Sequence, residues 1–139
     1  MVLSLAMFRP AVLLLLAACG DDAATPLDAA VTAPRETVTA QKALLVGELA
    51  EGTLTGGAQD RARITLTAPV AKLDWNIHGH AGGTSQTVEE ELGVMTATYE
   101  FTPTAQADWS LLLRNRDTAP MTVGVKLELY GAIAWSGWQ

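Results

Sequence analysis

The chain has 139 residues, of which 49% are hydrophobic and 17% are charged, and its formal net charge is −6. This length excludes a cofactor domain joined to a separate substrate domain. The acidic balance excludes sequence-independent binding to nucleic acid, which needs Lys and Arg to replace counterions on the phosphates. The single Cys, at position 19, excludes an internal disulfide.

The first 18 residues combine one basic charge with an apolar run. Arg9 is their only charged residue, and residues 11–18 are all apolar. Eight residues are too few to span a bilayer, which needs about 20, but they suit the apolar core of a secretory signal. Translation from Met7 instead of Met1 would make Arg9 the third residue, near the start of the signal. Without this segment the chain keeps 8 basic and 15 acidic side chains, a formal charge of −7.

The end of the apolar run, Leu16-Ala17-Ala18-Cys19, resembles the lipobox of bacterial lipoproteins. In that family the Cys thiol carries diacylglycerol, the signal is cleaved before the Cys, and the new amino group is acylated, for example with palmitate. The resemblance implies that Cys19 is the lipidated N-terminus of a mature protein facing the periplasm or exposed on the cell surface. It also implies that Gly20, where an Asp would signal inner-membrane retention, favours the outer membrane; Asp21 and Asp22 leave that choice open. The alternative is a plain secretory signal with an incidental Cys.

Residues 19–41 predict a flexible linker, because they are rich in Ala, Thr, Asp and Pro and show no sustained apolar period. In residues 42–139, runs of β-branched and aromatic residues alternate with Gly, Pro, Asn and Asp, a pattern that predicts strands and turns. We therefore expect one domain from residue 42 to residue 139. The expected strands are 44–54 with a break at Gly47 or Gly52, 61–67, 71–78, 86–92, 95–102, 108–114, 121–130 and 133–135.

The apolar residues of these strands alternate with polar ones. In the strand 121–130, Val123, Val125 and Leu127 fall on one face, and Lys126 and Glu128 on the other. A period of two with one polar face is typical of antiparallel sheets that pack on one side. Seven or eight such strands without a convincing helix predict an all-β fold, a two-sheet antiparallel sandwich of jelly-roll or immunoglobulin-like type.

The later half of the domain has an order of elements that is similar in outline to small β-sandwich accessory modules such as GOLD-like domains. The shared features are an aromatic strand (residues 73–78), a Thr-Pro step after Tyr99-Glu100-Phe101, an aliphatic strand ending in Arg114-Asn115, and a closing alternating strand around residues 123–125. This resemblance implies a non-catalytic interaction module with no catalytic residue. The chain also lacks a Gly-X-Ser-X-Gly elbow and a phosphate-binding loop, so we expect no enzymatic activity.

The strand 71–78 and the residues after it hold the main candidate site. If the backbone stays extended, Leu73, Trp75 and Ile77 face the core. The polar residues of the other face are Asp74, Asn76, His78 and His80. Imidazoles two residues apart on a strand can converge on one ion, as His-X-His pairs do in metal sites.

A third ligand could come from Glu89, Glu90 or Glu91 on the next strand, or from Met95. Two imidazoles and a carboxylate suit Zn or Cu(II), and a thioether would favour Cu(I). Two alternatives remain open for the same face: a polar patch that binds an envelope protein, and purely structural roles in which one imidazole caps a turn and the other is exposed.

Trp135 and Trp138 lie within the last five residues, which fray in most domains unless they are docked. They either close the edge of the sandwich or present a stacking surface to a sugar or a protein. The sequence thus supports a lipid-anchored binding or assembly module of the cell envelope, with a Zn or Cu binding protein and a carbohydrate-binding or structural module as alternatives.

Overall fold

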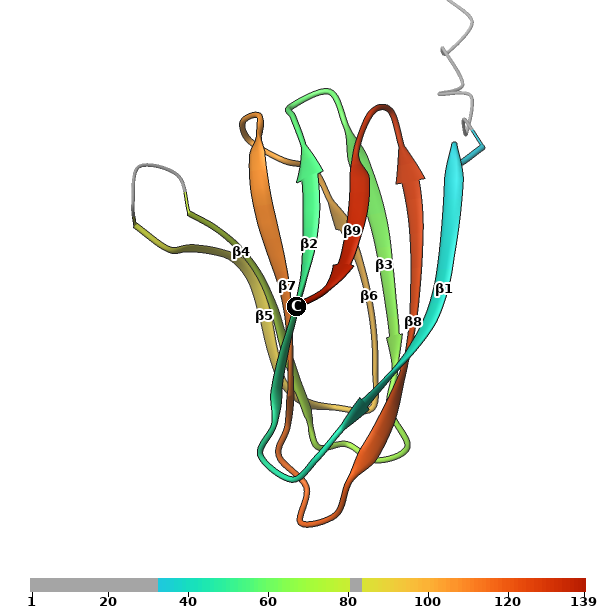
Figure 1. The fold of residues 1–139 in the computed structure, drawn as a ribbon, viewed down its shortest axis with the longest axis vertical. Coiled ribbons are helices and arrows are strands. Elements are labelled where there is room, and N and C mark those ends of the chain that lie inside the picture. The colour runs from blue at the N-terminus through green and yellow to red at the C-terminus, as the bar shows by residue number, and fades with distance from the viewer. Residues whose placement is uncertain (1–32, 81–83) are drawn as a thin grey trace, which may run out of the picture. The chain divides into compact units, whose positions relative to one another are not determined.

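The computed structural model describes residues 33–80 and 84–139. They form nine strands in two antiparallel sheets (Figure 1), a four-stranded sheet ordered β1-β8-β3-β6 and a five-stranded sheet ordered β5-β4-β7-β2-β9. The strands are β1 (Glu36–Leu44), β2 (Leu49–Gly56), β3 (Arg61–Thr67), β4 (Leu73–Gly79), β5 (Gln86–Val94), β6 (Thr96–Phe101), β7 (Ala107–Asn115), β8 (Met121–Tyr130) and β9 (Ala134–Trp138). The described part of the chain contains no helix long and apolar enough to cross a membrane.

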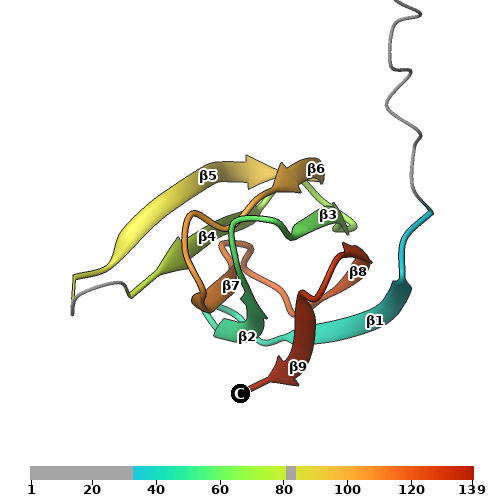
Figure 2. The ribbon, with the colours of Figure 1, turned by 90° about the horizontal axis from the view of Figure 1, so that it is seen from above.

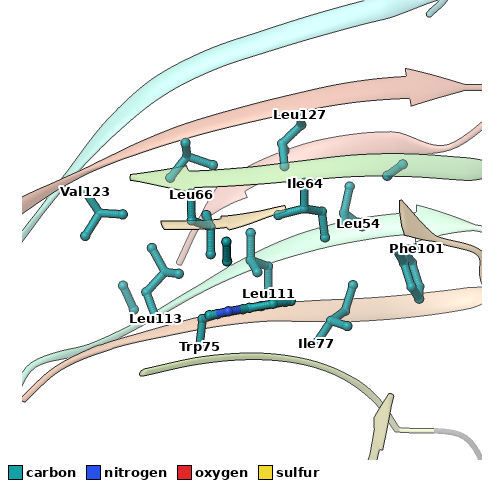
Figure 3. Close-up of a cluster of buried hydrophobic side chains, with 14 of the residues drawn as sticks. Leu54, Ile64, Leu66, Trp75, Ile77, Phe101, Leu111, Leu113, Val123 and Leu127 are labelled. Atoms are coloured by element: carbon teal, nitrogen blue, oxygen red, sulfur yellow. The ribbon is translucent and has the colours of Figure 1, made fainter. Parts of the chain in front are cut away.

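The hydrophobic core lies between the two sheets (Figures 2 and 3). The four-stranded sheet contributes Ile64, Leu66 and Leu127, and the five-stranded sheet contributes Trp75 and Leu111, all of them buried. Strands β2, β3, β7 and β8 turn every second side chain toward this layer, which is the geometry that the alternation in the sequence predicts. The prediction of an all-β, two-sheet antiparallel sandwich is therefore confirmed.

The first strand was not predicted. Residues 36–41, assigned to the linker by the sequence analysis, belong to β1, which is hydrogen-bonded to β8 along its whole length. That assignment is wrong for these residues. β1 is an edge strand with an exposed polar outer face, so its inward Val38 and Ala40 give only a weak apolar signal. The expected strand 44–54 is divided at Gly47, one of its two predicted break points: β1 ends at Leu44, and Gly47 occupies a turn at φ 72°.

The end of the sandwich at which β1 begins is held together by Asp60. Its carboxylate accepts hydrogen bonds from the backbone N–H groups of Gly57 (2.8 Å) and Ala132 (2.6 Å), and so joins the β2–β3 turn to the β8–β9 loop. Arg35 donates to the Gly131 carbonyl (2.9 Å) in the same loop. The N–H groups of Gly57 and Ala132 lower the pKa of Asp60 below its usual value because they stabilise the ionised form.

We expect the substitution Asp60→Asn to lower the free energy of unfolding at pH 7, because the amide cannot match a carboxylate that accepts from several N–H groups. The pKa of Asp60 is lower in the folded protein than in the unfolded chain, where it is about 3.9. The ionised carboxylate therefore contributes its full stabilisation above about pH 3.9 and loses it as the pH falls through the pKa of the folded state. Urea unfolding of both proteins between pH 7 and pH 3 measures this. A difference that stays constant over that range would contradict the assignment.

Candidate functional site

The strand β4 that carries the predicted site lies inside the five-stranded sheet, between β5 and β7. Leu73, Trp75 and Ile77 face the core and are buried, as predicted. Asp74 and His78 point to the other face but are also buried, because the neighbouring strands flank them on both sides. The outer face of β4 is thus a partly enclosed polar row in the middle of a sheet.

The two histidines lie side by side at the end of β4. The ring centroids of His78 and His80 are 5.0 Å apart, and the rings meet edge to face at 85°. His78 Nδ1 lies 2.7 Å from Asn76 Oδ1, within hydrogen-bonding distance. The His78 tautomer that donates from Nδ1 to this oxygen keeps its free lone pair on Nε2. The structure therefore brings together Asn76, His78 and His80, as the spacing on one strand face predicts.

The glutamates of β5 do not join this group. Glu91 lies opposite Trp75 and Glu89 opposite Ile77, so both share the inward face of the sheet, and Trp75 Nε1 donates to Glu91 Oε2 at 3.0 Å. Glu90, opposite Asn76, is on the outer face. Register shifts on either side of this run decide which glutamate meets which residue, and simple alternation cannot foresee them.

Met95 lies in the β5–β6 turn, at the far end of β5 from the histidines. Among the described residues no three His, Cys, Asp or Glu side chains are placed to hold one ion. The expected third ligand is therefore not brought to His78 and His80 by any of these four residues, and the Zn or Cu site stays a prediction built on two imidazoles.

Asp74 belongs to a different part of the same face. It accepts from the Gly93 N–H (2.9 Å) and from Arg116 (3.2 Å). This pair lies in a depression of about 360 Å³ on the outer face of the five-stranded sheet, bordered by Leu49 and Leu92. Asp74 thus holds the β5–β6 end of the sheet and does not reach the histidines at the other end of β4.

The two C-terminal tryptophans pack against the core. Trp135 lies over Gly52 of β2, where any side chain beyond hydrogen would overlap its ring, and the Trp135 and Trp138 centroids are 5.1 Å apart. Lys42 of β1 places its Nζ 6.0 Å from the Trp138 ring. Both rings are only half-buried, at the edge where β9 and β1 approach each other (Figure 2). They close that edge, and a role in stacking on a sugar or protein stays a prediction.

A group of exposed apolar side chains was not predicted from the sequence. Among the described residues, seven large hydrophobic side chains are exposed, and six of them lie in the loops and strand ends at which β1 finishes. These six are Leu45, Val46, Leu49, Val70, Leu92 and Met95, which we call the apolar tip. The available signal is the apolar run Leu44-Leu45-Val46, which falls within the expected strand 44–54.

The apolar tip is built on the side chain of Asn115, which is fully buried. Its amide donates to the carbonyls of Leu44 (3.3 Å), Leu45 (3.1 Å) and Ala119 (2.9 Å), and its oxygen accepts from the Asp117 N–H (2.8 Å). One side chain thus joins the β1–β2 loop to the β7–β8 loop.

Two backbone hydrogen bonds connect the remaining loops of the tip. Arg116 N donates to Lys72 O (2.8 Å), and Ala68 N donates to Met95 O (2.7 Å). Between the β1–β2 and β7–β8 loops lies a shallow apolar hollow of about 190 Å³, lined mainly by Leu45, Pro120 and Met121. The loops that carry the apolar tip are therefore joined to one another by hydrogen bonds at this end of the sandwich.

No protein-family model matches this chain, and no curated protein matches it. Several solved structures share its fold, among them the following two. Aeromonas hydrophila PliG, a periplasmic lysozyme inhibitor of g-type lysozyme, aligns with 70% of this chain and 88% of its own, at 9% identity and a TM-score of 0.51. The Yersinia pseudotuberculosis-derived mitogen YPM aligns with 76% of this chain and 95% of its own, at 12% identity and a TM-score of 0.57. At these identities the likeness establishes a shared β-sandwich fold.

We expect Asn115→Ala to lower the free energy of unfolding by about 2–3 kcal/mol, because it leaves buried backbone groups in two loops without partners. Chemical denaturation measures the loss. Thr118→Ala, an exposed position in the same loop, is the matched control and should change stability by less than about 0.5 kcal/mol. Equal effects of the two substitutions would show that the buried amide does not hold the tip.

Proposed function

We propose that this chain is a non-catalytic binding module of the bacterial cell envelope, held to a membrane by lipidated Cys19 and engaging a protein partner through the apolar tip. The observation that carries the proposal is the position of the tip. Arg35, just before β1, is hydrogen-bonded to Leu129 and to Gly131 of the β8–β9 loop. From that loop β1 runs along the sandwich to the apolar tip. The apolar tip therefore lies at the opposite end of the sandwich from the start of β1 (Figure 1).

The exposure of the tip supports a role in binding. Leu45 and Leu92 are 67% and 64% exposed, and a large apolar side chain gains about 1.5–3 kcal/mol when it is fully buried. Apolar residues gathered in one place on a protein surface mark interaction sites more often than scattered ones. Because Asn115 and the loop hydrogen bonds fix the backbone beneath them, a partner would meet a preformed surface.

The fold neighbours support the coarser part of the proposal. PliG is a periplasmic inhibitor of g-type lysozyme, so a protein of this fold has another protein as its target. This favours an envelope location and a protein partner for the present chain. The lipobox resemblance at residues 16–19 supports the anchor, and the outer membrane is the favoured location because Gly20 follows the Cys.

Photo-crosslinking in intact cells tests the apolar tip. We expect a photoreactive leucine analogue at Leu45 or at Leu92 to give a discrete adduct with a partner protein, because both side chains are exposed at the tip. The same probe at Thr98, exposed on the outer face of the four-stranded sheet, is the matched control and should give none. Adducts of equal yield at all three positions, or at none, would contradict the proposal.

Metal binding is a second candidate, favoured by the 5.0 Å separation of the His78 and His80 rings. We expect calorimetric titration of residues 20–139 with Zn(II) or Cu(II) to show one ion per chain at about micromolar affinity or tighter, with binding lost in the double variant His78→Ala/His80→Ala. Glu90→Gln, on the same outer face beside Asn76, is the control and should leave binding unchanged. Absence of binding to the unaltered protein would exclude this candidate.

A further inference from the structure

Within residues 33–80 and 84–139, the outer edge of β1 is not hydrogen-bonded to another strand. Among the described residues β1 pairs only with β8, in a register that is continuous from Glu36 to Leu44. Residues 37–41 contain no charge, no Pro and no Gly. Figure 2 shows β1 at the margin of its own sheet, with β9 of the other sheet approaching it near the Lys42 end. Such an edge presents a row of unpaired N–H and C=O groups to another chain.

The other sheet edges carry features that oppose pairing. β5 has two register shifts and three consecutive glutamates, residues 89–91. β9 has five residues and a register shift where it meets β2. β6 has six residues and carries Glu100, which is bound to Arg63. Bulges, charges and short length are the devices by which natural sheets avoid edge-to-edge association, and β1 has none of them within residues 37–41.

We propose that β1 pairs antiparallel with β1 of a second copy of this chain, about a two-fold axis at Thr39. In this register Thr37 faces the second copy's Gln41, and Val38 faces its Ala40. Glu36 of each copy then lies opposite Lys42 of the other copy, so the two-fold axis places one such ion pair at each end of the paired strands. A carboxylate opposite an ammonium stabilises a cross-strand pair. This self-complementary charge pattern is what selects a second copy over an unrelated strand.

The positions of the side chains are compatible with this pairing. Glu36, Val38, Ala40 and Lys42 share the inward face of β1, since they lie opposite Leu129, Leu127, Val125 and Val123 of β8. Val38 already packs against the core, so pairing would extend the apolar layer across the two-fold axis. The ion pair of Glu36 with Arg35 (3.3 Å) is half-exposed, so it leaves the carboxylate free to exchange partners.

Paired edge strands bury less surface than a standard protein interface, so a weak association is expected in dilute solution. Attachment of both copies to one membrane would raise their effective concentration, and for that reason the test is made with the full chain in cells. If the anchor at Cys19 were absent, the contact itself would be unchanged and only its occupancy would fall.

Cysteine crosslinking tests the contact and its register together. Residues directly opposite in an antiparallel pair have Cα atoms about 4.5–5.5 Å apart, within the range of a disulfide. We expect Thr39→Cys, expressed as the full chain and oxidised mildly in intact cells, to give a covalent dimer on a non-reducing gel. Gln41→Cys alone is the matched control, because residue 41 of one copy would lie about 13 Å along the strand from residue 41 of the other copy. Co-expressed Thr37→Cys and Gln41→Cys should crosslink with each other.

A charge exchange provides the second measurement. In the Thr39→Cys chain, Lys42→Glu places like charges opposite each other at both ends and should reduce the dimer yield at least tenfold. Adding Glu36→Lys restores opposite charges and should restore the yield. Resistance of each variant to added protease establishes that it is folded. The chain with Cys19 as its only Cys sets the background.

The outcomes are distinct. A Thr39→Cys dimer that responds to the charge exchange supports the proposal. Equal crosslinking of Thr39→Cys and Gln41→Cys would show random encounter and overturn it. Absence of a Thr39→Cys dimer in folded protein would overturn it as well, and would leave the edge to another strand or to an N-terminal segment of this chain. None of these results depends on whether the apolar tip binds a partner.

Discussion

The strands of this domain depend on one apolar layer, whose large aromatic rings fit only because glycine lies beneath two of them. Trp109 lies against Gly79 of β4, and Trp135 lies against Gly52 of β2, positions where a Cβ atom would overlap the ring. The close approach seats Trp109 beside Phe101 and lets Trp135 cover the edge of the core near β1. In the five-stranded sheet a large aromatic ring on one strand is therefore matched by a glycine on the neighbouring strand. Such matching of large and small residues is typical of close-packed protein interiors.

The two ends of the sandwich are held by single polar side chains with different surroundings. Asp60 accepts backbone N–H groups at the end where the chain enters, and Asn115 donates to backbone carbonyls at the other end. Both side chains satisfy loop backbone groups that have no sheet partner, which is how short loops remain ordered. In the part of the chain that the structure describes, only the Asn115 end combines such hydrogen-bonded loops with a group of exposed leucines and valines. The two ends of the sandwich therefore differ: β1 begins at the Asp60 end, and the apolar tip lies at the Asn115 end.

The sandwich could be predicted from the sequence because its physical cause is local in the chain. Alternation in β3 and β8 follows from a period of two, and their predicted bounds agree with the structure. β1 was missed because an edge strand buries one face only in part, and Val38 and Ala40 alternate with polar residues that resemble linker sequence. The proximity of His78 and His80 could be predicted because they lie two residues apart along the chain. The face on which Glu89 and Glu91 lie could not be predicted, since it depends on two register shifts between β4 and β5.

By itself the sequence determined the sheet class, the inward residues of most strands and the neighbourhood of the two histidines, since each follows from spacing along a single strand. The tertiary structure alone decided that loops far apart in the chain meet at one end, where Asn115 joins residues about 70 positions apart and gathers the apolar tip. It also decided that β1 is a sheet edge, because strand order depends on how nine strands divide between two layers. Contacts between distant segments are set by packing of the whole chain, which no local period encodes.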